Sequence, residues 1–173
     1  MRTAPLALAL AGVFFAGAAS AATSPVNGNL NVSATVAASC LVVGPNTMNF
    51  GAYDPADTNL TANLDVDGAI NIRCTKGTLA HVQLGQGNFS ATGSTCAAPL
   101  RQMTDGGVER LAYGLYTNAG RSTIWGCDPA NERTFTSVAS NAAFTMTVNG
   151  RIPPGQNVAA GSYSDTVVIN VSF

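Results

Sequence analysis

The sequence predicts an all-β protein built as a sandwich of short strands. Short segments with alternating apolar and polar side chains recur along the chain, separated by turns rich in Gly, Pro and Asn. No segment of helical length places its apolar residues at the 3.6-residue period of an amphipathic helix. Hydrophobic residues make up 46% of the chain and charged residues only 10%, which fits an exported β-rich protein.

Length and charge narrow the possible classes further. The 173 residues suffice for one ordinary domain and not comfortably for two. A net charge of −1 without any basic patch excludes a nucleic-acid-binding protein, and the composition excludes a disordered one.

We expect residues 1–21 to be a signal peptide. Arg2 supplies its positive start, residues 6–18 form an apolar run, and Ala19-Ser20-Ala21 fits the small-x-small rule for cleavage. The run is too short to span a bilayer comfortably, which argues against a membrane anchor. The mature chain would then begin at Ala22, be exported, and have no membrane span.

The first expected strand covers residues 26–36, just after the cleavage site. Its even positions are apolar apart from a glycine at position 28, and its odd positions are all polar. Because successive side chains of a strand point to opposite faces, one face is apolar and the other polar. An uncharged strand at a free end is an aggregation hazard unless its own fold or a neighbour covers it. The side chains expected to be buried are Leu30, Val32, Ala34 and Val36.

The same alternation predicts the next strands, each bounded by turn residues. Apolar residues 41–43 lead into a Gly-Pro-Asn turn, and Met48 and Phe50 alternate with polar neighbours. Residues 64–74 keep their apolar side chains on one parity, interrupted at a glycine where a bulge is expected. Residues 80–84 form a short strand ahead of a polar, glycine-rich loop.

The second half of the chain contains four further expected strands. Residues 111–117 are followed by a loop and Trp-Gly-Cys, residues 135–138 give a weak pattern, and residues 144–152 a strong one that ends before Pro-Pro-Gly. In the last strand, residues 163–173, the apolar side chains share one face and Asp165 is the charged exception.

The four cysteines at positions 40, 74, 96 and 127 agree with an oxidising compartment, and none are spaced as a CxxC motif. The sequence permits three pairings, of which we favour Cys40 with Cys74 and Cys96 with Cys127. Each bridge would close a loop of roughly thirty residues and add about 3–4 kcal/mol to the free energy of unfolding in the chain-entropy model.

The chain offers little for catalysis or for holding a metal or cofactor. His81 is the single histidine and is expected to point outward from its strand, whereas zinc sites usually draw on several histidines or free cysteines. The Asp-Val-Asp-Gly run at residues 65–68 lacks the remaining ligands of a calcium loop, so we expect a solvated turn. Glu109 and Glu132 are the only glutamates, and nothing indicates a glycosidase pair. We expect a protein that is not an enzyme and binds no cofactor or metal.

Several features together resemble the spore coat protein U family, whose members include the pilins of archaic chaperone–usher pili. The similarity covers almost all of the mature chain, and the ending together with the Leu-x-Tyr-x-Leu-Tyr and Trp-Gly combination is fairly specific. The matching features are the strand before Cys40, Phe50-Gly51-Ala52-Tyr53-Asp54-Pro55, Ile70-Asn71-Ile72-Arg73-Cys74, Leu111-Ala112-Tyr113-Gly114-Leu115-Tyr116, Trp125-Gly126, and the alternating residues 161–173.

The resemblance implies an incomplete immunoglobulin-like β-sandwich that is completed by a donor strand from a neighbouring subunit. Residues 22–38 would be the N-terminal donor-strand extension, and residues 39–173 the pilin domain of the spore coat U type. In that family a periplasmic chaperone first fills the open groove, and the donor strand replaces it at an outer-membrane usher. The family typically links a cysteine like Cys40 to one like Cys74, whereas a pair like Cys96 and Cys127 is less general. The residues expected along the groove edge, in contact with the chaperone, are Val167, Ile169, Val171 and Phe173.

The resemblance implies a structural subunit of a surface pilus, a head-to-tail polymer of identical subunits that supports adhesion and biofilm formation. A single domain with an N-terminal extension suits a shaft subunit, because a tip adhesin would be expected to carry an additional binding domain. Two alternatives stay open from the sequence. One is a coat protein on spores or cells, and the other is a monomeric secreted β-sandwich binding module or hydrolase whose N-terminal strand closes its own sandwich.

Overall fold

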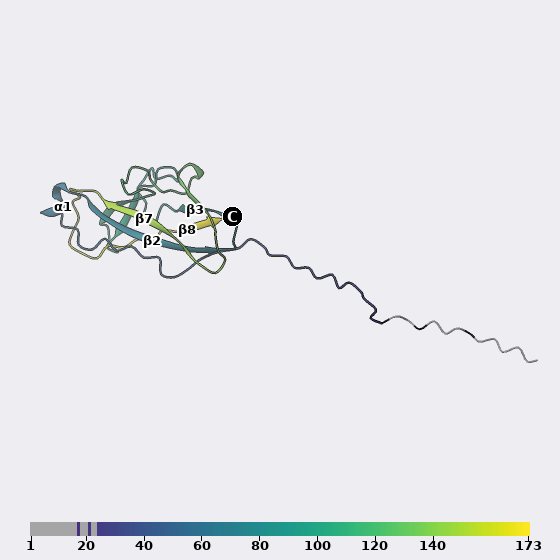
Figure 1. Ribbon diagram of the computed structural model, residues 1–173. Helices are drawn as coiled ribbons and strands as arrows, with labels where there is room; N and C mark the ends of the chain where they lie inside the picture. Colours follow the sequence, from purple (N-terminus) through teal and green to yellow (C-terminus); the bar gives the residue numbers. More distant parts are fainter. Residues whose placement is uncertain (1–16, 18–20, 22–23) are drawn as a thin grey trace, which may run out of the picture. The chain divides into compact units, whose positions relative to one another are not determined.

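The computed structural model describes residues 17, 21 and 24–173 (Figure 1). Most of the expected signal peptide, residues 1–21, lies outside the described residues, as do positions 22 and 23. The chain divides into two units, Met1–Thr35 and Val36–Phe173, each of which is described by itself. Among the described residues, no helix has the length and apolar character that a membrane crossing would require.

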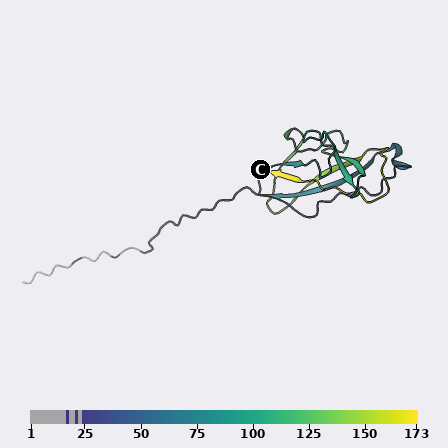
Figure 2. The same ribbon diagram turned by 180° about the vertical axis from the view of Figure 1, so that it is seen from behind.

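The unit Val36–Phe173 is an all-β sandwich of two antiparallel sheets, as predicted (Figure 1, and Figure 2 from behind). The larger sheet has the strand order β1-β2-β7-β5-β4 and the smaller sheet the order β6-β3-β8. The strands of the larger sheet are β1 Cys40–Val42, β2 Leu64–Cys74, β7 Phe144–Ile152, β5 Arg110–Tyr116 and β4 Arg101–Thr104. Those of the smaller sheet are β6 Arg133–Thr136, β3 Leu79–Leu84 and β8 Ile169–Ser172. Two short helical turns complete the unit, namely α1 Thr58–Thr61 and the 3-10 turn η1 Pro129–Asn131.

An apolar core lies between the two sheets. Inward positions of β2 and β3 alternate with outward ones, so that Ile72 and Val82 are fully buried. Trp125, from the loop after β5, is also fully buried, and its indole N–H donates to the backbone oxygen of Val82 at 2.9 Å. Full burial of an aliphatic side chain contributes about 1.5–3 kcal/mol. The alternation in the sequence therefore identifies the core face of both sheets.

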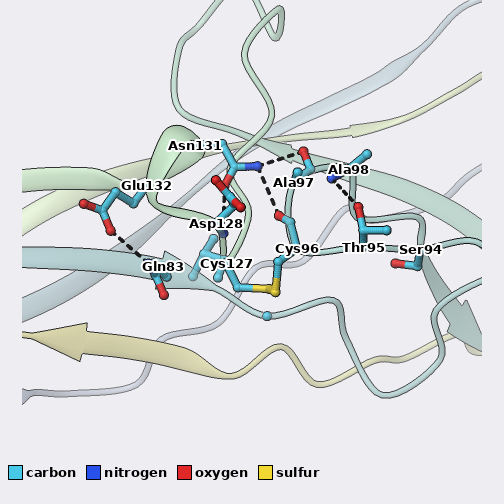
Figure 3. Close-up of a disulfide and its surroundings, with 12 residues drawn as sticks. Gln83, Ser94, Thr95, Cys96, Ala97, Ala98, Cys127, Asp128, Asn131 and Glu132 are labelled. Carbon is cyan, nitrogen blue, oxygen red and sulfur yellow. Dashed lines mark hydrogen bonds between the residues drawn. A yellow bond between two sulfur atoms is a disulfide. The ribbon is translucent and has the colours of Figure 1, made fainter.

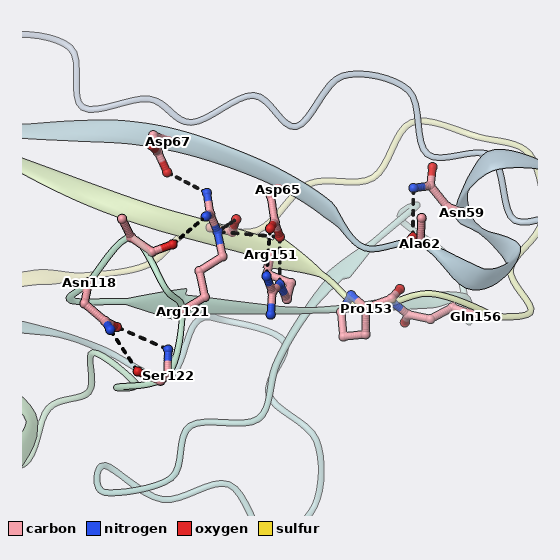
Figure 4. Close-up of polar contacts among 12 residues, drawn as sticks. Asn59, Ala62, Asp65, Asp67, Asn118, Arg121, Ser122, Arg151, Pro153 and Gln156 are labelled. Carbon is pink, nitrogen blue, oxygen red and sulfur yellow. Dashed lines mark hydrogen bonds and ion pairs between the residues drawn. The ribbon is translucent and has the colours of Figure 1, made fainter.

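The strand expected at residues 64–74 is confirmed as β2, but the solvated turn expected within it at residues 65–68 is not formed. These residues lie within β2, which pairs with β7 in continuous register and without the expected bulge. Arg151 of β7 donates to both carboxylate oxygens of Asp65 at 2.7 Å, and Arg121 donates to Asp67 at 2.6 Å (Figure 4). The hydrogen bond from Arg151 lowers the pKa of Asp65. Both carboxylates are therefore outward strand residues in an ion-pair network across the larger sheet.

Residues 48–50, expected as a strand, form no ladder within the described chain. Their burial nevertheless alternates, since Met48 and Phe50 pack against the core while the residue between them is exposed. Gly150 of β7 makes this approach possible, because a Cβ there would lie 2.6 Å from Met48 Sδ and 2.7 Å from Phe50 Cζ. The segment is thus packed like a strand but lacks a partner strand in this unit.

Both disulfides have the pairing favoured from the sequence. Cys40 and Cys74 are register partners in β1 and β2, with their Cα atoms 4.1 Å apart. Cys96 and Cys127 join two loops, with their Cα atoms 4.5 Å apart (Figure 3). Beside this second bridge, the side-chain amide of Asn131 donates to the backbone oxygen of Cys96 at 3.1 Å. The first bridge therefore ties an edge strand to its sheet, and the second ties loops together.

Removing the Cys40–Cys74 bridge should destabilise the domain more than removing the Cys96–Cys127 bridge. Loss of a native disulfide in a small exported domain costs about 2–5 kcal/mol, and Cys74 is in addition a core residue that is 2% exposed. Urea unfolding of the purified protein should compare Cys40→Ser/Cys74→Ser with Cys96→Ser/Cys127→Ser. An equal loss in both variants would contradict this ranking. Reactive thiols in unfolded, unreduced wild-type protein would contradict the pairing itself.

Candidate strand-binding groove

A groove opens between two segments that lie far apart in the sequence. Its narrower part is a cavity of about 250 Å³ between residues 46–50 and residues 163–169. Its wider part, of about 830 Å³, continues between residues 48–55 and residues 158–163. The two parts lie next to each other, because they have lining side chains in common, and we refer to them together as the groove. The shared residues are Met48, Phe50, Met103 and Tyr163.

The floor of the narrower part is the apolar core itself. Ile70 of β2, Leu115 of β5 and Val148 of β7 come from the larger sheet, and Leu84 of β3 comes from the smaller one. All four side chains are at most 6% exposed. An apolar segment lying in the groove would therefore contact the core directly.

Unpaired backbone edges border the groove on both sides. Residues 44–50 belong to no ladder in the described chain. The strand β8 pairs with β3 on one side, and its other edge has no partner among the described residues. Because an unpaired edge is a template for another strand, one extended segment in the groove could hydrogen-bond to both edges.

Three of the four C-terminal residues predicted for the groove edge lie against the core. Val167, Ile169 and Val171 are half-buried, and Val167 and Ile169 line the narrower part of the groove. Phe173 is 59% exposed and lies beyond the end of β8 at Ser172. The alternation therefore predicts the inward face of β8, and Phe173 departs from it because the strand has ended.

The four predicted donor residues are exposed. Leu30, Val32 and Val36 have 88%, 84% and 81% of their surface accessible, and Ala34 is also exposed. Residues 24–39 carry no assigned strand. An exposed apolar row of this length indicates an interaction segment, because single exposed apolar residues are common but contiguous ones are not.

The wall opposite β8 was not predicted as part of the site. Met48, Phe50 and Tyr53 line the wider part of the groove. The hydroxyl of Tyr53 donates to the backbone oxygen of Pro153 at 2.9 Å and accepts the N–H of Gln156 at 3.1 Å, which holds this wall against the chain after β7. The alternation at residues 48–50 is the one sequence feature that points to this wall. By itself it predicts a strand and does not indicate that the strand borders a groove.

Asp165 is the one charged residue among those that line the narrower part. Its Oδ2 accepts the hydroxyl of Tyr113 at 2.7 Å, and its Oδ1 accepts the backbone N–H of Asn88 at 2.9 Å and that of Thr166 at 2.7 Å. Burial, and then the hydrogen bond to Asp165, raise the pKa of Tyr113, so its hydroxyl remains a donor at neutral pH.

Arg101 of β4 is a buried cation close to this carboxylate, with 1% of its surface exposed. Its guanidinium donates to the backbone oxygens of Gly85 and Leu84 at 2.8 Å each and to that of Trp125 at 2.7 Å. Burial lowers the pKa of Arg101 to about 10, an effect that Tyr113 and Asp165 partly offset. The side chain is therefore still charged at neutral pH, and it fixes the end of β3 to the loop at Trp125.

His81 points outward from β3, as predicted, and forms a surface cluster. Its Nδ1 lies 2.5 Å from one carboxylate oxygen of Glu132, and Gln83 donates to the other at 2.9 Å. These two hydrogen bonds lower the pKa of Glu132. In the part of the chain that the structure describes, no group of three or more His, Cys, Asp or Glu side chains is placed to hold a metal ion.

Comparison with known proteins identifies a family, a relative by sequence and a solved structure of similar fold. The Spore Coat Protein U domain family matches residues 26–170. Protein U of Myxococcus xanthus is 37% identical over 161 residues, which cover 90% of this chain and 88% of that protein. A solved structure, the CsuC–CsuE chaperone–tip adhesion subunit pre-assembly complex from archaic chaperone–usher Csu pili of Acinetobacter baumannii, contains a chain of similar fold. Its TM-score is 0.56 at 22% identity, and the match covers 80% of this chain but only 40% of that one.

The family match extends from residue 26, just before the exposed apolar row at residues 30–36, into β8, and so includes both walls of the groove. The segments that form the groove therefore all lie within the part of the chain that the family shares. The chain belongs to the Spore Coat Protein U domain family.

Proposed function

We propose that this protein is a structural subunit of a surface pilus assembled by the chaperone–usher pathway, in which a strand of one subunit completes the sandwich of the next. One observation carries the proposal. The same chain has an open apolar groove between two unpaired edges and an exposed, alternating apolar row at residues 30–36. Membership of the family and the likeness to a chain from a chaperone–subunit complex support it.

The row and the groove match in chemistry. The floor of the groove is aliphatic, and the row offers Leu30, Val32, Ala34 and Val36 on one face, with uncharged polar residues on the other. Each buried Leu or Val would contribute roughly 1.5–3 kcal/mol. Each backbone hydrogen bond to a groove edge would add about 0.5–1.5 kcal/mol.

A strand from one copy that fills the groove of another makes a heterologous contact, and repeated head to tail it gives an open filament of identical subunits. Before assembly the groove needs a temporary occupant. We assign that role to a periplasmic chaperone that contributes an edge strand, with exchange at an outer-membrane usher. Exported by the signal at residues 1–21, such a filament would stand on the cell surface and serve adhesion and biofilm formation.

A coat protein on spores or cells is the second candidate. The name of the family, Spore Coat Protein U domain, favours this candidate, as does the 37% identity to Protein U. The same strand exchange could build either assembly. Electron microscopy of cells with and without the gene separates the two, because a pilus subunit gives fibres and a coat protein gives a surface layer.

Val32→Asp should abolish polymerisation and leave the chaperone-bound subunit intact. The substitution removes an aliphatic contribution of roughly 1.5–3 kcal/mol and would bury an unpaired carboxylate in the neighbour's groove, at a cost of several kcal/mol more. Ser33→Asp, on the opposite face of the same segment, is the matched control and should assemble nearly as wild type. Ladders of SDS-resistant multimers and co-purification with the chaperone are the two measurements.

Two outcomes would count against this proposal. If Val32→Asp loses the chaperone-bound subunit together with the multimers, the row belongs to the core of its own domain. If mature wild-type protein stays a monomer under assembly conditions, the protein is better explained as a monomeric secreted binding module than as a pilus subunit.

Ile169→Asp should prevent capture by the chaperone. Ile169 is a half-buried residue of β8 that lines the groove, so a carboxylate there would lie where the occupant's apolar side chains must pack. Asn170→Asp changes the next, exposed residue of the same strand and should be nearly neutral. The readout is the amount of each subunit recovered with the chaperone from the periplasm. Equal recovery of the two variants would show that β8 is not an edge of the binding groove.

A further inference from the structure

Asp165 is a carboxylate in a row of half-buried residues that is otherwise apolar or aromatic, including Tyr163, Val167 and Ile169. A charged group at such a position is costly unless hydrogen bonds satisfy it. Its two oxygens accept three hydrogen bonds, from the Tyr113 hydroxyl and from two backbone N–H groups. The carboxylate is therefore held in place rather than free in the groove.

The chain crosses from one sheet to the other at this point. Ser164 pairs with Thr104 of β4 through two backbone hydrogen bonds of 3.0 and 2.9 Å, whereas from Ile169 onward the chain pairs with β3. Residues 165–168 span the gap between these two sheets and belong to no ladder. They form part of the C-terminal wall of the groove, because Asp165 itself lines it.

The backbone of the loop after β3 contacts this carboxylate directly. The backbone N–H of Asn88 donates to Asp165 at 2.9 Å, and the N–H of Gly85 donates to the backbone oxygen of Val168 at 2.9 Å. Gly87 has a φ of +85°, and a Cβ at this residue would collide with Asp165. Only glycine therefore allows the loop to come this close, and Tyr113 reaches the same carboxylate from β5 in the other sheet.

We propose that Asp165 is a positioning residue for strand capture. Together with Tyr113 it holds residues 165–168 across the gap between the sheets, so that the C-terminal wall stays apart from the wall at residues 46–50 and the groove can accept a strand. Without these hydrogen bonds, a wall segment that has no ladder would tend to move over the apolar floor and narrow the groove. This inference rests on the proposed function, because it assigns Asp165 a role in filling the same groove.

The test uses the chaperone–subunit complex and a synthetic peptide with the sequence of residues 24–38. Release of the chaperone after addition of the peptide, followed by size-exclusion chromatography over time, gives the rate of strand capture. Tyr113→Phe keeps the ring and removes only the hydroxyl, so capture should be about tenfold slower, as expected for one hydrogen bond to a charged group. Asp165→Ala removes all three hydrogen bonds and should be at least as slow. Tyr116→Phe, on the opposite face of β5, and Asp105→Asn, in an exposed loop, should exchange like wild type.

Two further readouts distinguish positioning from general destabilisation. The double variant Tyr113→Phe/Asp165→Ala should be no slower than Asp165→Ala alone, because loss of the carboxylate already removes the hydrogen bond from Tyr113. In Asp165→Ala, which lacks both side-chain oxygens, hydrogen exchange should accelerate at the amides of Asn88 and Thr166. Additive rates, or unchanged protection of both amides, would overturn the inference.

The outcomes also separate this inference from the proposed function. If the wild-type complex does not take up the peptide, strand exchange itself is wrong and the role of Asp165 falls with it. If the wild type takes up the peptide and Tyr113→Phe does so at the same rate, only the role of Asp165 is wrong. Should Asp165→Ala not be recovered with the chaperone, Tyr113→Phe alone decides between these results.

Discussion

The open groove is the constraint on which the rest of the structure depends. Its floor is made of core side chains, and its two borders, residues 44–50 and β8, have no partner strand among the described residues. Backbone groups without hydrogen bonds and apolar surface in contact with water both raise the free energy of the domain. A further strand would pair these backbone groups and cover this apolar surface. The exposed row at residues 30–36 has the alternation that such a strand requires.

Several contacts hold the two walls of the groove in place. The Cys40–Cys74 bridge ties β1 to β2, immediately before the segment that borders the groove. Gly150 lets the side chains of that segment sit close against the larger sheet. On the other side, Arg101 fixes the end of β3, which is the only partner of β8 in the described chain. Each of these contacts strengthens a wall of the groove, and none of them fills it.

The sequence predicts what is local and misses what depends on distant partners. A period of two is a local property, so the strands and inward faces of β2, β3 and β8 could be predicted. Residues 65–68 were misread because their arginine partners lie more than fifty positions away. The lack of a ladder at residues 44–50 is a property of the whole sheet, which no local pattern reveals. The contact between Asp165 and Tyr113 joins residues 52 positions apart and likewise needs the fold.

Amide hydrogen exchange, measured on the mature protein before and after assembly, tests the central claim most directly. If one copy's strand fills the groove of another, assembly should slow exchange at residues 46–50 and 169–172 and, at the same time, at residues 26–36. Protection of all three segments together is the expected result. If residues 26–36 still exchange freely in the assembled protein, the strand does not occupy the groove, and strand exchange is not how this protein assembles.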